Sequence, residues 1–317
     1  MVYLILILTL AGIVLSADML VSGSVGIARR LKISDFVIGA VIVGIGTSMP
    51  ELTVSFMGAL EGNADVAIGN IVGSNIFNIL GILGITSLLF PLAVNKDSIR
   101  FEIPFCVGIS VLLTLLAYNF FYKPYPVISR LDGIILMFTF VVFLWVSVGR
   151  GRIESYSEEE LVPKKHPKLW ISITKTVLGL IILILSCDYF VKSAIYIARD
   201  FGVDDGFISI TLIACGTSLP EFAASITAAL KKNPDLSLGN IIGSNIFNIG
   251  LILGVSSQVT PLISPEINII DYLVCIFAAI LPLILGIKGT LSRLSGAFML
   301  LCFILYVIYL WRVQIAI

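Results

Sequence analysis

The sequence predicts an all-α integral membrane protein of ten transmembrane helices, arranged as two inverted five-helix repeats. Three observations lead to this fold class: an apolar composition, ten apolar segments of membrane-spanning length, and an internal repeat. Of the 317 residues, 58% are apolar and 13% are charged, and the mean hydropathy is +1.07. A water-soluble protein of this length needs a larger polar surface. The net charge of zero does not suggest a nucleic-acid partner.

Each apolar segment has about the 20 residues that cross a bilayer as a helix, or somewhat more. The segments span residues 2–27, 34–60, 66–90, 101–121, 131–148, 169–198, 205–230, 236–260, 268–287 and 291–312. The longest gap between them, 149–168, is rich in charged residues and is expected to be a solvated linker. The first five-helix repeat is therefore expected at 1–148 and the second at 169–317.

The charges of the loops predict the orientation in the membrane. With the N-terminus outside, the internal loops carry 14 Lys and Arg residues and the external ends carry 4. We therefore expect both termini to be extracellular, the central linker to be cytoplasmic, and the protein to lie in the plasma membrane.

An internal repeat is visible at an offset of 170 residues. Residues 16–84 align with 186–254 without a gap, and 31 of the 69 positions are identical. GTSMPE (46–51) matches GTSLPE (216–221), and GNIVGSNIFNI (69–79) matches GNIIGSNIFNI (239–249). Because each half has five segments, the second half enters the membrane from the opposite side. Inverted repeats are frequent in secondary transporters, which bind their substrate between the halves near the middle of the membrane.

Each repeat has one glutamate inside a motif-bearing apolar segment, Glu51 and Glu221. A carboxylate at bilayer depth is costly unless it faces a cavity and meets a partner. No Lys or Arg lies at a matching depth in the segments that carry the motifs. We therefore expect the partner to be a mobile cation, and the alternative is a protonated glutamate with a structural hydrogen bond.

A proline precedes each glutamate, at Pro50 and Pro220. Proline removes one helical hydrogen bond and clashes with the carbonyl four residues earlier, where both repeats have a glycine. We expect the motifs 44–51 and 214–221 to unwind over their first five residues, and the alternative is a simple proline kink. The carbonyls that this unwinding would free are those of Gly44, Thr47, Ala214 and Thr217.

The second motif supplies hydroxyl and amide groups. Its polar residues are Ser74, Asn75 and Asn78 in the first repeat and Ser244, Asn245 and Asn248 in the second. The serine and the last asparagine are four residues apart and share a helical face. The middle asparagine points to another face and is expected to bond to a neighbouring helix. Hydrogen bonds between helices are the alternative for all six residues, and the glycines of the motif are expected to serve close helix packing.

The oxygens of both motifs make up one coordination set. Two bidentate carboxylates and two carbonyls supply six oxygens, and a water or a side chain supplies a seventh. Calcium takes about six to eight oxygens, whereas magnesium resists the loss of its water. The absence of sulfur and imidazole from the set argues against zinc, copper and nickel. Several Na⁺ ions could use subsets of the same oxygens.

At these motifs the chain resembles the sodium/calcium exchangers of the calcium/cation antiporter superfamily, specifically the prokaryotic members. GTSMPE with GNIVGSNIFN is similar to the first α-repeat of that family, and GTSLPE with GNIIGSNIFN is similar to the second. The resemblance covers the whole chain. It implies an antiporter in the lipid bilayer that exchanges Na⁺ for Ca²⁺ by alternating access, and we expect it to function as a monomer.

The resemblance also implies roles for single residues. Glu51 and Glu221 would be the central calcium ligands, shared with sodium, and Thr47 and Thr217 would offer their carbonyls to calcium. The flanking sodium sites would be completed by Ser48, Ser74, Ser218 and Ser244, with the carbonyls of Gly44 and Ala214. Asn78 would line the middle of the site. Asp18 and Asp188 lie on the segments that are thought to form the gate, where anchoring or gating is expected rather than ion ligation.

One position departs from the family pattern. Many exchangers have an aspartate where this chain has Asn248, which keeps the shape and one acceptor oxygen but cannot ionise. The site then has two carboxylates and a nearly symmetric pair of asparagines, Asn78 and Asn248. This argues against potassium co-transport but leaves the calcium ligands in place.

Two other functions are compatible with the sequence. A proton/calcium antiporter is possible because buried carboxylates can exchange protons, although the serine hydroxyls favour sodium. A cation channel or a membrane scaffold without transport activity is the third hypothesis. An enzyme and a bound cofactor are not expected, because the chain has a single histidine, no CxxC pair and no recognisable pair of nucleophile and base.

Overall fold

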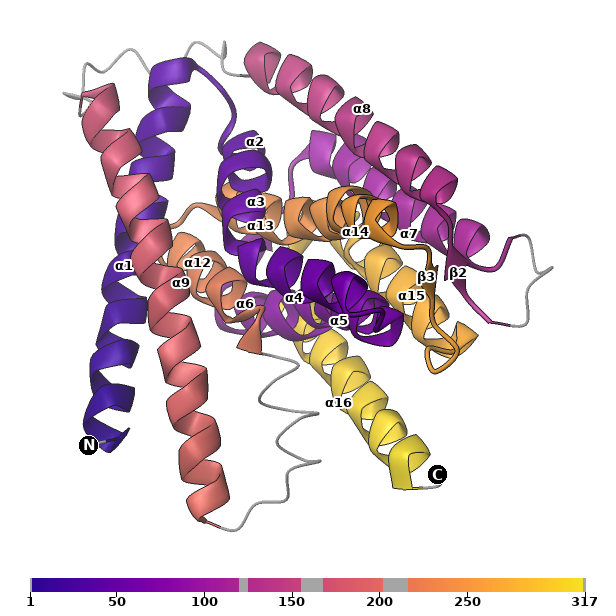
Figure 1. Cartoon of the computed structure of the whole chain (residues 1–317). Helices are drawn as coiled ribbons and strands as arrows, with labels where there is room; N and C mark the ends of the chain where they lie inside the picture. The colour runs from indigo at the N-terminus through magenta and orange to yellow at the C-terminus, as the bar shows by residue number, and fades with distance from the viewer. Residues whose placement is uncertain (1, 120–124, 155–167, 202–215, 316–317) are drawn as a thin grey trace. The chain divides into compact units, whose positions relative to one another are not determined.

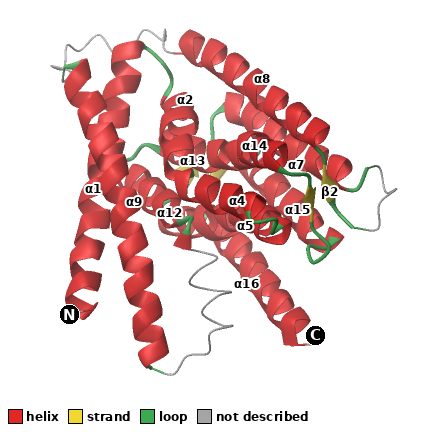
Figure 2. Ribbon diagram, viewed as in Figure 1, coloured by secondary structure: helices red, strands yellow, loops and turns green. Residues whose placement is uncertain are grey.

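The computed structural model describes residues 2–119, 125–154, 168–201 and 216–315, and in these ranges the chain is almost entirely helical (Figure 1, Figure 2). The described strands have two residues each and form two antiparallel pairs. β1 (Leu92–Ala93) pairs with β4 (Thr290–Leu291), and β2 (Val127–Ile128) pairs with β3 (Leu262–Ile263). Apart from these short pairings, the predicted all-α class is confirmed.

Eight of the described helical segments are long and apolar enough to cross a membrane. They cover residues 2–31, 64–89, 98–117, 130–150, 169–200, 234–259, 269–286 and 293–312. Asp35–Thr47 and Met49–Leu60 form a ninth span if they are counted as one segment. The expected segment 205–230 lies partly outside the described residues. The chain is therefore a multi-pass membrane protein.

The chain forms two compact units, and each unit combines residues from both halves of the sequence. Unit 1 consists of Met1–Ser48 and Val142–Gly243, and unit 2 consists of Met49–Val141 and Ser244–Ile317. The two motif glutamates fall in different units: Glu51 belongs to unit 2 and Glu221 belongs to unit 1.

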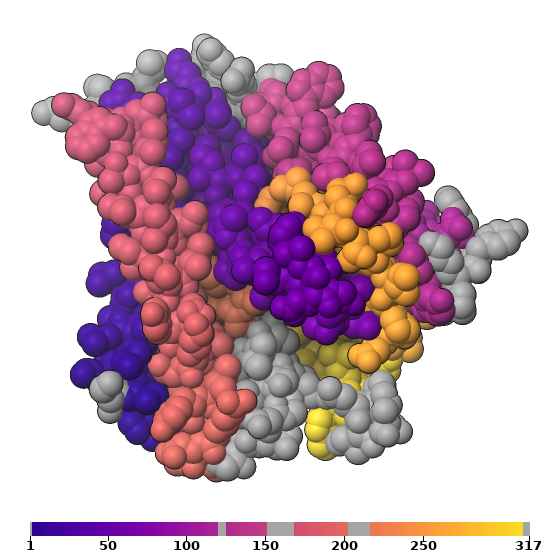
Figure 3. Space-filling view, viewed as in Figure 1, coloured from indigo at the N-terminus to yellow at the C-terminus, as the bar shows by residue number. Residues whose placement is uncertain are grey.

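Unit 1 is built on two long helices, α1 (Val2–Leu31) and α9 (Leu169–Asp200), which lie side by side (Figure 1). Small residues permit this contact, since Gly179 of α9 lies against the backbone of Leu20 in α1. Figure 3 shows the side chains of α9 on the near face, where many large apolar residues are exposed, as expected for a surface in contact with lipid. The other elements of unit 1 are α2 (Asp35–Ile38), η1 (Gly39–Val43), α3 (Gly44–Thr47), α12 (Leu219–Leu230), the end of α8 (Arg130–Glu154) and α13 (Pro234–Phe247) up to Gly243.

Unit 2 contains the remaining elements and its own buried core. Phe140 and Phe247 make a T-shaped contact with ring centroids 5.6 Å apart. Tyr118 and Tyr272 make a second T-shaped contact at the same distance of 5.6 Å. The helices of unit 2 are α4 (Met49–Leu60), α5 (Ala64–Ile76), η2 (Phe77–Leu83), α6 (Gly84–Leu89), η3 (Ser98–Glu102), α7 (Ile103–Ala117), the start of α8, the end of α13, η5 (Asn248–Leu253), α14 (Gly254–Val259), α15 (Ile269–Gly286) and α16 (Arg293–Ile315).

Candidate ion-binding site

The first motif interrupts its helix, but over a shorter stretch than the sequence suggested. Residues 44–47 remain helical as α3, and only Ser48 leaves the helix, with φ −83° and ψ 13°. The carbonyl of Gly44 is not freed, because it accepts the N–H of Ser48 at 3.1 Å. The expectation of unwinding over 44–48 is therefore corrected. The reason is that Pro50 removes only its own N–H, whereas the residues up to Ser48 keep theirs.

The repeat-related motif has the same break. Thr217 and Ser218 form a turn, Ser218 has φ −85° and ψ 8°, and α12 then starts at Leu219. Ala214, the other expected carbonyl donor of this motif, lies outside the described residues. A turn residue two positions before the proline is thus a property of both copies, since the backbone geometry of Ser218 is close to that of Ser48.

Both motif glutamates are fully buried in the first turn of their helices. In unit 1, the hydroxyl of Ser48 donates to Oε1 of Glu221 at 2.7 Å. In unit 2, the hydroxyl of Ser74 lies 3.5 Å from Oε1 of Glu51, which is the limit for a hydrogen bond. The structure therefore brings two of the predicted hydroxyl groups next to the predicted carboxylates. Ser218 and Ser244 are buried as well.

An asparagine that sequence reasoning missed holds each glutamate by its backbone. Nδ2 of Asn70 donates to the carbonyl of Glu51 at 3.1 Å and to Oγ of Ser55 at 2.9 Å. The second copy repeats this: Nδ2 of Asn240 donates to the carbonyl of Glu221 at 3.1 Å and to Oγ of Ser225 at 2.8 Å. The identity of all these positions between the repeats was a signal that could have pointed to them.

The second motif forms a reciprocal pair of asparagines in unit 2. Nδ2 of Asn75 donates to the carbonyl of Asn245 at 3.1 Å, and Nδ2 of Asn245 donates to the carbonyl of Asn75 at 3.0 Å. The expectation that these two residues bond to neighbouring helices is confirmed. Their side-chain oxygens accept from Asn248 and Asn78 respectively, each at 3.0 Å.

This network determines the orientation of Asn78 and Asn248. Since the Nδ2 group of each donates within the network, its Oδ1 points away from it. Both Oδ1 atoms are buried and have no hydrogen-bond partner among the described residues. A buried amide oxygen in this situation is costly unless a ligand or a water satisfies it.

A π-helical segment follows the motif helix in both repeats. η2 begins at Phe77, one residue before Asn78, and η5 begins at Asn248 itself. π-helical turns inside α-helices frequently occur at functional sites. Asn78 and Asn248 therefore both lie in the first turn of a π-helical segment.

The described residues contain no group of three or more His, Cys, Asp or Glu side chains that could hold a metal. A cation bound at these motifs would therefore rely on hydroxyl, amide and carbonyl oxygens in addition to carboxylates. Such a set is compatible with Na⁺ and Ca²⁺ and does not suit softer metals. The one hydrogen of the Thr47 hydroxyl faces the carbonyl of Val43 at 3.0 Å and Oδ1 of Asn240 at 3.2 Å.

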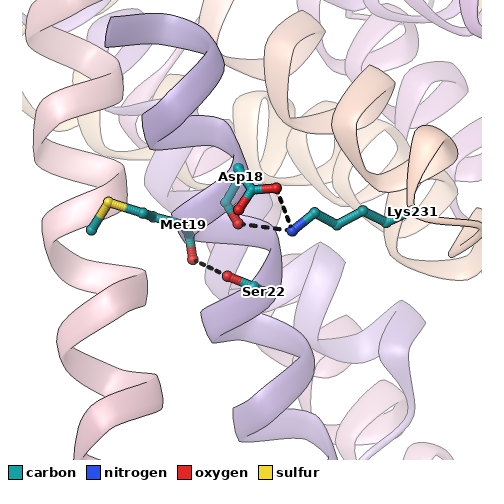
Figure 4. A network of polar contacts seen from close by, with 4 residues as sticks. All are labelled: Asp18, Met19, Ser22 and Lys231. Atoms are coloured by element: carbon teal, nitrogen blue, oxygen red, sulfur yellow. Dashed lines mark hydrogen bonds and ion pairs between the residues drawn. The ribbon is translucent and has the colours of Figure 1, made fainter.

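The two aspartates of the long helices differ in their contacts. Lys231 follows α12, and its Nζ lies 2.6 Å from the carboxylate of Asp18 in α1 and 3.2 Å from the backbone carbonyl of Asp18 (Figure 4). Asp188 of α9 instead pairs with Lys192 of the same helix at 2.8 Å. In the structure, Asp18 thus attaches α1 to the turn after α12, whereas Asp188 makes an ion pair within α9.

The glycines of the second motif differ as well. Gly239 and Gly243 pack directly against the backbone of Phe36 and Ala40, so the expected close packing is confirmed there. Gly69 lies near Ile267, but a Cβ atom at Gly73 would meet no described atom within 4 Å. The repeat counterparts of Phe36 and Ala40 are Gly206 and Ile210, which lie outside the described residues, so the expected close packing of Gly69 and Gly73 stays a prediction.

A family model described as "Sodium/calcium exchanger protein" matches residues 1–149 and 171–312. The chain belongs to the sodium/calcium exchanger family. The resemblance inferred from the two motifs is thereby confirmed, and so is the membrane character of the protein. The family is named for ion exchange, which is transport and not an enzymatic reaction.

Proteins of known sequence and structure match this exchanger family member over most of its length. CaxA of Alkalimonas amylolytica is 40% identical over 316 residues, which cover 95% of this chain and 96% of the relative. The sodium/calcium exchanger MaX1 of Methanosarcina acetivorans is 29% identical over 98% of this chain and 99% of its own. The sodium–calcium exchanger NCX_Mj, in crystals soaked with 10 mM Na⁺ and no Ca²⁺, is 31% identical with a TM-score of 0.83, over 96% of this chain and 98% of its own.

Proposed function

We propose that this protein is a secondary active antiporter that exchanges Na⁺ for Ca²⁺ by alternating access. The observation that supports this most directly is the environment of Glu221. Its carboxylate is fully buried next to a helix break and accepts a hydroxyl at 2.7 Å. A carboxylate at bilayer depth that lies beside irregular backbone is typical of an ion site in a transporter.

The ion ligands of this proposal come from both motifs. Glu51 and Glu221 supply the carboxylates, and the carbonyls of Thr47 and Thr217 complete the calcium set. The remaining ligands, used by sodium in different combinations, are Ser48, Ser74, Ser218, Ser244, Asn78, Asn248 and the carbonyl of Ala214. The orientation of Asn78 and Asn248 supports their inclusion, since each has a buried oxygen available for a cation or its water.

The membrane arrangement belongs to the same proposal. Ten transmembrane segments form two inverted repeats, 1–148 and 169–317, joined by a cytoplasmic linker at 149–168. The bias of loop charges supports extracellular termini in a plasma membrane. Labelling of single cysteines introduced near residue 96 and near residue 63 with a membrane-impermeant reagent tests this orientation. Labelling of intact cells at the first position would contradict it.

Transport in proteoliposomes tests the function. An outward Na⁺ gradient is expected to drive Ca²⁺ uptake, and Glu51→Gln or Glu221→Gln is expected to abolish it, because each removes one of two charges that balance Ca²⁺. Glu102→Gln is the matched control, since Glu102 is another buried glutamate of unit 2 that lies outside both motifs. Robust uptake by either motif variant would refute the ligand assignment.

The second candidate is a proton/calcium antiporter, and the complete burial of both carboxylates favours it. Burial disfavours the ionised form, so protons can compete with cations at these groups. Ca²⁺ flux driven by a pH gradient in the absence of sodium would support this function over sodium coupling.

A further inference from the structure

Glu51 and Glu221 lie at the starts of α4 and α12, where a helix has fewer hydrogen bonds of its own. Both lie in the first turn, where the N–H groups have no helical acceptors. The residue before each is a proline, and the chain leaves the helix two residues earlier still. The position of each carboxylate therefore depends on support from outside its own helix.

Asn70 and Asn240 supply this support. Each amide group uses both of its hydrogens on the helix that carries the glutamate, one on the carbonyl of the glutamate and one on a serine hydroxyl four residues later. The two acceptors lie one turn apart on the same helical face, so the asparagine bridges the first turn of α4 or α12.

Asn240 makes a further contact that couples two parts of the site. Its Oδ1 lies 3.2 Å from the hydroxyl of Thr47, which shares its one hydrogen between Asn240 and the carbonyl of Val43 at 3.0 Å. The same side chain thus contacts Thr47 at the end of α3 and Glu221 at the start of α12. All three residues belong to unit 1. The repeat-related hydroxyl, that of Thr217, has no hydrogen-bond partner among the described residues.

We propose that Asn240 and Asn70 are positioning residues that set the affinity for the transported cation without touching it. Asn240 has the larger effect, because it contacts both Thr47 and Glu221, whereas the contacts of Asn70 among the described residues are with Glu51 and Ser55. The proposal rests on the ligand assignment of the proposed function. It adds two residues outside the ligand set, whose amide hydrogens bond to the helices that carry the glutamates.

Cation affinity, measured by isothermal titration of the full chain in detergent, tests the proposal. Asn240→Ala is expected to weaken Ca²⁺ binding about ten-fold, which corresponds to the loss of about one buried hydrogen bond. Asn70→Ala is expected to have a smaller effect. In proteoliposomes, both variants are expected to raise the half-saturating Ca²⁺ concentration while the maximal rate stays within about two-fold of wild type.

Thr47→Val separates positioning from ligation. It removes the hydroxyl that bonds to Asn240 but keeps the backbone carbonyl, and it is expected to weaken affinity about five-fold. Thr47→Ser keeps a hydroxyl and is expected to restore the affinity. Combined with Asn240→Ala, Thr47→Val should add almost nothing, because both changes remove the same bond.

Two results would overturn the proposal: wild-type affinity in folded Asn240→Ala, or full additivity of Asn240→Ala and Thr47→Val. If Asn240→Ala fails to fold, Thr47→Val alone decides, because it leaves the asparagine in place. If wild-type protein binds Na⁺ but not Ca²⁺, the proposed exchange of calcium fails. The positioning role is then tested with Na⁺ as the probe, and the same order of variants is expected.

Discussion

The two repeats agree in the buried motifs and differ in the turns next to them. The turns at 61–65 and 231–235 share a backbone hydrogen bond. The backbone N–H of Asn63 donates to the carbonyl of Gly58 at 2.8 Å, and that of Asn233 donates to the carbonyl of Ala228 at 2.9 Å. Their charges are nevertheless reversed: the first turn begins with Glu61 and Gly62, and the second begins with Lys231 and Lys232.

The difference shows which parts of a repeat are constrained by chemistry. The hydrogen bonds around Glu51 and Glu221 recur almost unchanged, because a buried polar group needs all its partners. The exposed turns lie outside that constraint, and lysine in the second turn agrees with the excess of basic residues in the predicted cytoplasmic loops. One consequence is the attachment of Asp18 to Lys231, which has no charge-compatible counterpart at Glu61.

The largest effect on stability is expected at Asn75 and Asn245, through which the two repeats make reciprocal hydrogen bonds. Asn75→Ala and Asn245→Ala should each lower stability by about 2 kcal/mol, because each removes hydrogen bonds and leaves buried groups unpaired. The two losses should be equal, since the two residues make the same bonds. Thermal unfolding in detergent measures this. A clear difference between the two variants would show that the pair is not energetically symmetric.

The next effect concerns the attachment of α1. Lys231→Glu should lower stability by about 1 kcal/mol, since it replaces an ion pair with two like charges. Glu61→Lys is the matched change in the other turn and should have little effect, because Glu61 is exposed. The exchange of both charges, Asp18→Lys with Lys231→Glu, should recover the loss. If the exchange does not recover stability, the ion pair is not the cause of the defect.

A smaller effect is expected at the second position of the turns. Lys232 has φ 59°, a conformation that costs energy for residues with a side chain, whereas Gly62 has φ 74° without that cost. Lys232→Gly should therefore stabilise the protein by about 0.5 kcal/mol, and Gly62→Ala should destabilise it by a similar amount. Thermal unfolding measures both variants, and their melting midpoints should shift from that of wild type in opposite directions.

The smallest effect is expected for the ion pair within α9. Lys192→Ala removes the contact with Asp188, but both side chains are largely exposed and lie on one helix. The melting midpoint should stay within experimental error of wild type. A loss as large as that of Lys231→Glu would mean that Asp188 has an anchoring role similar to that of Asp18.

The breaks next to Pro50 and Pro220 illustrate the reach and the limit of sequence reasoning. Proline and glycine identify where a helix is interrupted, so the interruption itself was predictable in both repeats. Its length was not, because Ser48 could still donate its N–H to Gly44 and keep that carbonyl bonded. Local composition shows where a bond is lost but does not show which neighbouring bonds persist.

The sequence by itself determined the membrane character, the nearly all-helical class, the repeat and the family, because these follow from apolar composition and from polar residues at a constant spacing. Only the tertiary structure decided which partners the buried polar groups have. The assignment of Asn70 and Asn240 to the backbone of the two glutamates is one example, and the reciprocal bonds of Asn75 and Asn245 are another. The physical reason is that a side-chain amide can donate to any acceptor within about 3 Å, and only the packing of helices distant in sequence brings one there.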